Sequence, residues 1–182
     1  DLGDRPERRQ LTSGRFEIDT VDLSRDGSTF YIRSTEVHPG ERHLYAMKVD
    51  GGTRTKLSSM TGNYDGAVAP DDSTFGVVYS AANQPPEVYL MPNRAAASAT
   101  RVTTSTSAEW RQHKWLEPQL VTYKTRDGVE VYARLYTPEM VGARRNPQNP
   151  AVIFVHGAGY AQNAHKFWST YYREYMFHHL LA

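Results

Sequence analysis

The 182-residue sequence contains no cysteine, so disulfide bonds and thiolate metal sites are both excluded. It also lacks any apolar run near the ~20 residues that a membrane-spanning helix needs. Residues 1–10 are charged where a signal peptide would be apolar. Neither sign of charge is in clear excess, because 21 Lys and Arg stand against 20 Asp and Glu. This balance argues against a nucleic-acid-binding protein and, with the missing apolar run, predicts a soluble chain.

The seven histidines show no metal-ligand spacing, since none lies in a His-Glu-x-x-His run and no cysteine can complete a mixed site. They are His38, His43, His113, His156, His165, His178 and His179. We therefore expect no metal and no cofactor. A cysteine-free composition fits the cytosol and the periplasm equally, and a leader lost upstream of the chain stays an open alternative.

What the sequence does contain is an internal repeat of about 45 residues. The phrase Gln10-Leu11-Thr12-Ser13 recurs as Lys56-Leu57-Ser58-Ser59 and again as Arg101-Val102-Thr103-Thr104. A second phrase, Ser28-Thr29-Phe30, returns 45 residues later as Ser73-Thr74-Phe75. Three copies at one period indicate a repeated structural unit.

Each repeat reads as four short strands separated by turn residues. In the first unit we expect strands at residues 16–23, 29–36, 43–49 and 53–57. In the second unit we expect strands at residues 63–69, 74–80, 87–91 and 100–103, with a turn at Pro85-Pro86. Four strands per ~45 residues predict β-propeller blades, with an ordinary antiparallel meander as the alternative. Because a propeller has typically 4 to 8 blades, we expect further blades upstream of Asp1.

The pattern changes after Thr104. Residues 105–117 are polar and irregular apart from Trp110 and Trp115. Two alternating runs follow at residues 120–125 and 129–136, and the Asp-Gly between them predicts a β-hairpin. We interpret these two tryptophans and Trp168 as packing anchors at a domain junction.

An unbroken apolar run, Ala-Val-Ile-Phe-Val at residues 151–155, lies between Pro150 and His156. Such a run predicts a strand covered on both faces, as in a parallel α/β sheet, and the start of a buried helix is the alternative. From residue 167 to residue 182, apolar and aromatic residues recur at spacings of three and four, which predicts a helix.

The glycine loop, defined as His156, Gly157, Ala158, Gly159 and Tyr160, follows the apolar run directly. In α/β-hydrolases a loop of the His-Gly-Gly type at this place supplies one backbone N–H of the oxyanion hole. Small residues let the main chain approach the substrate carbonyl. A simple turn that ends a strand is the alternative for a motif this short.

These features together resemble the propeller-to-hydrolase junction of the prolyl oligopeptidase family, in its dipeptidyl peptidase IV branch. The resemblance spans the whole chain, from the repeats through Thr122-Tyr123-Lys124-Thr125-Arg126-Asp127-Gly128 to the glycine loop. It implies antiparallel four-stranded β-propeller blades at residues 1–112, followed by the N-terminal part of an α/β-hydrolase domain at residues 113–182.

The resemblance also implies a function and a set of partners. Family members are serine peptidases whose propeller admits short peptides, many of which they cut after Pro or Ala. The partner would be a peptide substrate and not a nucleic acid, the parent protein could be a homodimer, and a periplasmic or secreted location is favoured over the cytoplasm.

Within the glycine loop the resemblance places the oxyanion donor at the Ala158 N–H, with Tyr160 as a second candidate. His156 stands where several relatives carry a Tyr whose hydroxyl donates to the oxyanion. No Gly-x-Ser-x-Gly occurs in the chain, and in α/β-hydrolases the Ser, Asp and His follow the oxyanion loop. We therefore expect the catalytic triad beyond Ala182 and no activity from this piece alone.

Two other functions remain open from the sequence. One is an acylaminoacyl peptidase or esterase on the same scaffold, because fold does not fix function. The other is a non-catalytic binding module, in which a partial propeller presents the loops at residues 36–42 and 81–86 to another protein.

Overall fold

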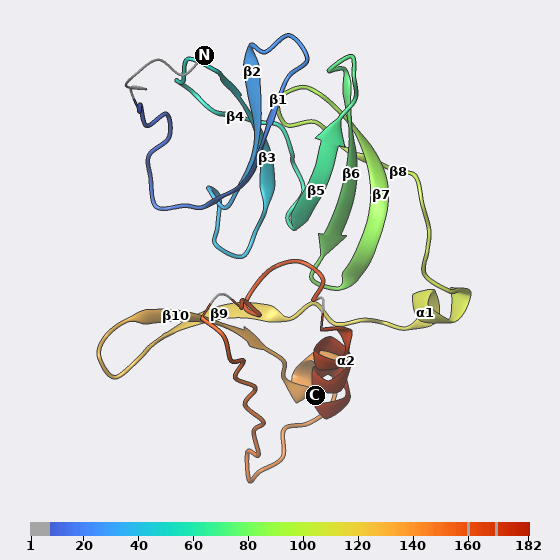
Figure 1. Ribbon diagram of the computed structural model, residues 1–182. Coiled ribbons are helices and arrows are strands. Elements are labelled where there is room, and N and C mark those ends of the chain that lie inside the picture. The colour runs from blue at the N-terminus through green and yellow to red at the C-terminus, as the bar shows by residue number, and fades with distance from the viewer. Residues whose placement is uncertain (1–7, 160, 170) are drawn as a thin grey trace.

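The computed structural model describes residues 8–159, 161–169 and 171–182, and Figure 1 shows two antiparallel sheets beside a hairpin and a helix. The first sheet has the order β1 (Ile18–Leu23), β2 (Thr29–Ser34), β3 (His43–Lys48) and β4 (Thr55–Lys56). The second repeats that order with β5 (Asn63–Val68), β6 (Thr74–Ala81), β7 (Gln84–Pro92) and β8 (Thr100–Arg101). The predicted four-stranded antiparallel units are confirmed, and we call them blade 1 and blade 2.

The same turn joins the first two strands of each blade. Asp26 in blade 1 and Asp71 in blade 2 each accept a hydrogen bond from the N–H of the serine two residues later, at 2.9 and 3.1 Å. Between aspartate and serine the backbone is left-handed, with φ 71° at Gly27 and φ 57° at Asp72. Glycine adopts this conformation without cost and Asp tolerates it better than most residues, so the two blades solve one turn with different residues.

The repeated closing phrase also has a structural role. Ser58 Oγ accepts the N–H of Leu44 at 3.1 Å, and in blade 2 Thr103 Oγ1 accepts the N–H of Val88 at 2.9 Å. In both blades the residue before the hydroxyl donates its own N–H to the carbonyl of that same third-strand residue, at 2.8 Å. A hydroxyl is therefore required where the short fourth strand leaves a third-strand donor without a backbone partner.

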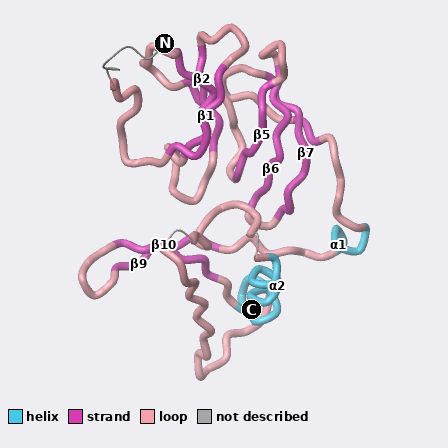
Figure 2. The backbone as a smooth tube through the Cα atoms, in the orientation of Figure 1, coloured by secondary structure: helices cyan, strands magenta, loops and turns pink. Residues whose placement is uncertain are grey.

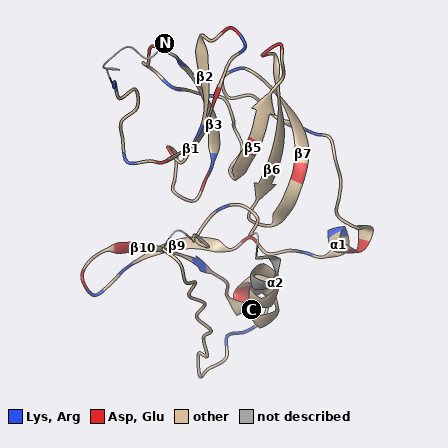
Figure 3. Ribbon diagram, viewed as in Figure 1, with Lys and Arg blue, Asp and Glu red and all other residues tan. Residues whose placement is uncertain are grey.

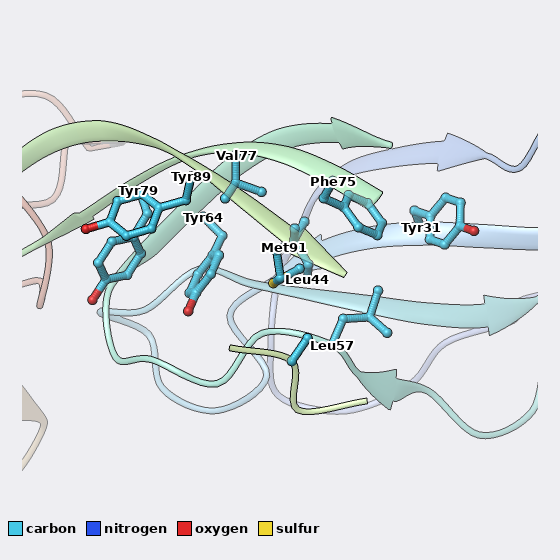
Figure 4. Close-up of a cluster of buried hydrophobic side chains, with 10 residues drawn as sticks. Tyr31, Leu44, Leu57, Tyr64, Phe75, Val77, Tyr79, Tyr89 and Met91 are labelled. Atoms are coloured by element: carbon cyan, nitrogen blue, oxygen red, sulfur yellow. The ribbon is translucent and has the colours of Figure 1, made fainter. Parts of the chain in front are cut away.

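The main core lies between the two blades. Tyr31 of β2 meets Phe75 of β6 edge to face, with 5.1 Å between ring centroids. Figure 4 shows side chains from both sheets converging there. The buried members are Tyr31, Leu44, Leu57, Tyr64, Phe75, Val77, Tyr79, Tyr89, Met91 and Ala97. Burial of this apolar surface is what holds the blades together, at roughly 25 cal/mol per Å² removed from water.

Two sequence expectations are wrong, one within the second repeat and one just after it. Pro85 and Pro86 lie inside β7 rather than in the turn, which falls at residues 82–83. Residues 105–117 are not wholly irregular, because they contain α1 (Ala108–Gln112). The Ser107 side chain starts this helix by accepting the Trp110 N–H at 3.0 Å, a capping signal that is easily overlooked in a polar stretch.

The remaining elements form a small unit next to the blades. The predicted hairpin is confirmed as β9 (Gln119–Lys124) and β10 (Glu130–Leu135), followed by a short 3-10 helix, η1 (Pro138–Val141). The predicted C-terminal helix is present as α2 (Tyr172–Leu181), shorter at its start than expected. None of the described helices is long and apolar enough to cross a bilayer. Figure 3 shows basic and acidic residues interspersed along the sheets and the hairpin.

The buried strand expected at residues 151–155 is not formed. These residues belong to no sheet, as Figure 2 shows, and Ile153 and Val155 are 85% and 81% exposed. A strand needs neighbours for its N–H and C=O groups, and a strand of a parallel sheet also needs a layer on each face. The β9–β10 sheet is only two-stranded, and the described residues provide neither requirement here. The apolar composition of residues 151–155 favours a buried strand, but this composition does not by itself provide neighbouring strands.

Candidate functional site

The described part of the glycine loop, residues 156–159, is exposed throughout. The His156 ring nitrogen Nδ1 lies 2.9 Å from the carbonyl oxygen of Gly157. Ala158 has a left-handed backbone with φ 62°, and its carbonyl accepts the Ala161 N–H at 3.1 Å. Tyr160 lies outside the described residues. The loop therefore turns tightly at Ala158, the residue expected to provide the oxyanion donor.

The segment that follows, residues 161–169, packs against blade 1. The Lys166 N–H donates to the Gly40 carbonyl at 2.8 Å, and the Gln162 side-chain amide donates to the Pro39 carbonyl at 3.0 Å. Arg42 completes the contact by donating to the Gln162 side-chain oxygen at 3.1 Å. The loop at residues 36–42, which the sequence suggested as a binding surface for another protein, thus contacts residues 161–169 of the same chain.

The same segment reaches blade 2 through its aromatic end. The Trp168 N–H lies 3.4 Å from Ser80 Oγ of β6, and the Trp168 ring lies 4.6 Å from that of Tyr175 in α2. Trp110 and Trp115 stack on each other at 3.9 Å, and Trp168 meets Trp110 edge to face at 5.4 Å. The three tryptophans therefore pack together, as expected, and their place at a domain junction stays a prediction.

A buried hydrogen-bonded chain runs through the blade-1 side of this contact. Ser58 Oγ lies 2.8 Å from His43 Nδ1, and His43 Nε2 lies 2.7 Å from Glu41 Oε2. Because the Glu41 carboxylate can only accept, His43 donates to it from Nε2, and in the neutral imidazole Nδ1 then accepts the Ser58 hydroxyl proton. Burial lowers the pKa of His43, which favours this neutral form.

Although Ser58, His43 and Glu41 have the composition of a nucleophilic triad, their burial rules out that role. Ser58 and His43 are each 1% exposed, so no substrate carbonyl can reach the hydroxyl. The chain instead orients Glu41. Burial would raise the pKa of Glu41, but hydrogen bonds from Lys166 and His43 outweigh it and hold that pKa below its ordinary value.

His165, within residues 161–169, has a pKa well below its ordinary value. It is 4% exposed and stacks on Phe167 with 3.8 Å between ring centroids. Burial, aided by the nearby Arg134 guanidinium, lowers the pKa of His165 to about 3. A neutral, stacked imidazole is a packing element at ordinary pH, so we assign His165 no chemical role.

Two surface cavities, of about 410 and 330 Å³, lie away from the glycine loop. The first is lined by Lys114, Leu116 and η1, and the second by the β6–β7 turn together with Arg101, Trp110 and Trp115. No lining residue belongs to residues 156–159. Among the described residues no group of three or more His, Asp or Glu side chains could hold a metal ion.

Sequence reasoning missed the contact residues Glu41 and Lys166. They lie 125 positions apart, and neither belongs to a motif. The one available signal was the charged loop before His43, which was read as a surface for a partner protein. No local pattern could show that residues 161–169 would occupy it.

Comparison with known proteins gives a family-model match over part of the chain and a similar fold over most of it. Residues 2–86 match the family model described as the dipeptidyl peptidase IV N-terminal region. The fold is similar to the crystal structure of Porphyromonas gingivalis dipeptidyl peptidase 4, with a TM-score of 0.68 and 20% sequence identity. That match covers 93% of this chain and 24% of the other, so the chain spans about a quarter of the solved structure's length.

Proposed function

We propose, from the match of residues 2–86 to the family model described as the dipeptidyl peptidase IV N-terminal region, that the chain is part of a serine peptidase. The proposed reaction is hydrolysis of short peptides, with release of dipeptides after Pro or Ala. The family match carries the proposal. The fold similarity, which extends to 93% of the chain, supports it for the part beyond residue 86.

We place the domain boundary of the parent protein at residues 112 and 113. The last blade strand ends at Arg101, and α1 ends at Gln112. The chain then enters the hairpin, the apolar run and the glycine loop, in the order expected for the start of an α/β-hydrolase domain. In the parent, residues 151–155 would gain neighbouring strands and lose their exposure.

The glycine loop would serve as the oxyanion loop of this peptidase. When a serine attacks the scissile carbonyl, negative charge develops on its oxygen, and backbone N–H groups at hydrogen-bond distance stabilise that charge. We assign one donor to the Ala158 N–H. The other would come from the residue after the nucleophile, in sequence beyond Ala182.

The left-handed backbone of Ala158 limits which substitutions can test the Ala158 N–H donor. Proline would remove the N–H, but its ring fixes φ near −65° and cannot adopt the observed 62°. A backbone ester at position 158 removes the donor without changing φ. In the full-length parent we expect it to lower kcat by about 10² to 10³ with little change in KM. An unchanged kcat would move the donor elsewhere.

A substrate panel on the full-length parent tests the proposed activity. We expect faster release of p-nitroaniline from Gly-Pro and Ala-Ala dipeptide anilides than from their N-acetylated counterparts. The one competing activity with a supporting feature is acylaminoacyl peptidase, whose members carry a His-Gly-Gly loop like His156-Gly157 here. Preference for acetylated substrates, or for simple p-nitrophenyl esters, would overturn dipeptidyl peptidase activity.

A further inference from the structure

Glu41 links blade 1 to the segment behind the glycine loop. Its side chain is only 6% exposed, and its two oxygens have separate partners. Oε1 accepts the Lys166 ammonium at 2.7 Å, and Oε2 accepts His43 Nε2 at 2.7 Å. Because one oxygen of this carboxylate is held by blade 1 and the other by residues 161–169, Glu41 couples the positions of the two.

The blade side of this link is buried and fully hydrogen-bonded at His43 and Ser58. His43 and Ser58 are each 1% exposed, and the Ser58 hydroxyl is itself fixed by the Leu44 N–H in β3. The Glu41 carboxylate therefore has its orientation set by the sheet before it meets Lys166. Charge-assisted hydrogen bonds with one partner held in place are the stronger kind, because less freedom is lost when they form.

The segment side of the link is close-packed against the same loop. The Lys166 N–H donates to the Gly40 carbonyl at 2.8 Å. A Cβ added at Gly40 would come within 3.1 Å of His165 Cα and 3.3 Å of the Ala164 carbonyl oxygen. The backbones of the two segments thus touch at Gly40, next to the ion pair. Only six residues separate Lys166 from the last described residue of the glycine loop, Gly159.

We propose that Glu41 is a positioning residue for the oxyanion loop: through Lys166 it fixes the segment that carries the chain away from the glycine loop. The catalytic part of this inference rests on the proposed peptidase function. The structural part, a blade-to-segment link made by Glu41 and Lys166, stands independently of any activity.

Hydrogen–deuterium exchange on the 182-residue chain tests the link itself. The reporter is the Lys166 amide, in a peptide covering residues 163–168. We expect E41Q and K166M each to speed its exchange about 10- to 100-fold, and the double variant to add little beyond either. K166R, which keeps the charge, should restore near wild-type exchange. Because the Lys166 side chain is 34% exposed, K166M reports on the link even if E41Q destabilises blade 1.

Glu36 provides the matched control. It forms an ion pair with Arg54 at 2.6 Å in the same blade, away from residues 161–169. We expect E36Q to leave exchange of the reporter peptide unchanged. Unchanged exchange in E41Q and K166M, or an equal effect of E36Q, would overturn the link whatever the activity of the parent.

Kinetics of the full-length parent test the positioning role. We expect K166M to lower kcat by up to about 100-fold with KM changed less than twofold, and K166R to recover most of the loss. Faster exchange in K166M with unchanged kcat would overturn the positioning role. Failure of the proposed function appears differently, as a wild-type parent that hydrolyses no dipeptidyl substrate.

Discussion

Replacing Ser58 with Ala removes the hydroxyl that joins β3 to the closing phrase of blade 1. Two buried groups lose their partner, the Leu44 N–H at 3.1 Å and His43 Nδ1 at 2.8 Å. Ser58 is 1% exposed, so water cannot replace the hydroxyl without opening the sheet. An unsatisfied buried polar group costs about 1–3 kcal/mol, which for two groups gives about 2–4 kcal/mol after partial relaxation.

This loss is large against the 5–15 kcal/mol by which a typical domain is stable. Urea denaturation followed by far-UV circular dichroism measures it, and the midpoint should fall by about 1–2 M. Thr103→Val removes the equivalent bond to Val88 in blade 2, together with the hydrogen bond that Thr103 Oγ1 donates to the buried Glu87 carboxylate. We expect a comparable loss of unfolding free energy there, about 2–4 kcal/mol. A loss below 0.5 kcal/mol for Ser58→Ala would refute the role assigned to the repeated hydroxyl.

Three further predictions follow from single residues. Gly27→Ala should cost about 1–2 kcal/mol of unfolding free energy at its φ of 71°, whereas Gly76→Ala, in β6 with open space around it, should be neutral or slightly stabilising. Burial lowers the pKa of His165 from 6.5 to about 3, so as the pH falls this histidine binds a proton in the unfolded chain before it does so in the folded chain. The free energy of unfolding should therefore decrease below pH 6.5 by up to ~1.4 kcal/mol per pH unit, and His165→Phe should remove this contribution. The exposed apolar run at residues 151–155 should make the 182-residue chain self-associate, and Ile153→Lys should reduce this in sedimentation velocity, because Ile153 is 85% exposed.

Each of these has an outcome that counts against its reasoning. Equal losses at Gly27 and Gly76 would show that backbone conformation is not the cause. A His165→Phe protein whose urea midpoint shifts with pH as the wild type does would place the acid sensitivity in other groups. Association unaffected by Ile153→Lys would point to another surface.

The blades were predictable because their stabilising contacts repeat along the sequence. Each short strand is bounded by turn residues, and the hydroxyls of Ser58 and Thr103 recur 45 residues apart. The offset itself reflects one set of hydrogen bonds made twice. Local patterning of this kind is visible without knowledge of the fold.

The region after the blades was predicted less well, for a different reason. The apolar run at residues 151–155 has the composition of a buried strand, but a strand is defined by its neighbours, which the run does not encode. The Glu41–Lys166 contact is equally invisible, because its partners are distant and belong to no periodic pattern. The features that the sequence did not predict depend on contacts between distant residues, whereas those that it did predict depend on local secondary-structure patterns.

The central proposal is that the blades and the glycine loop are part of a serine peptidase, with the nucleophile predicted beyond Ala182. Labelling with a fluorophosphonate probe tests it most directly, applied in parallel to the 182-residue chain and to the full-length parent. We predict stoichiometric labelling of one serine in the parent, blocked by a dipeptidyl substrate, and no labelling of the 182-residue chain. Labelling of a serine within residues 1–182, or an unlabelled and inactive parent, would contradict the account.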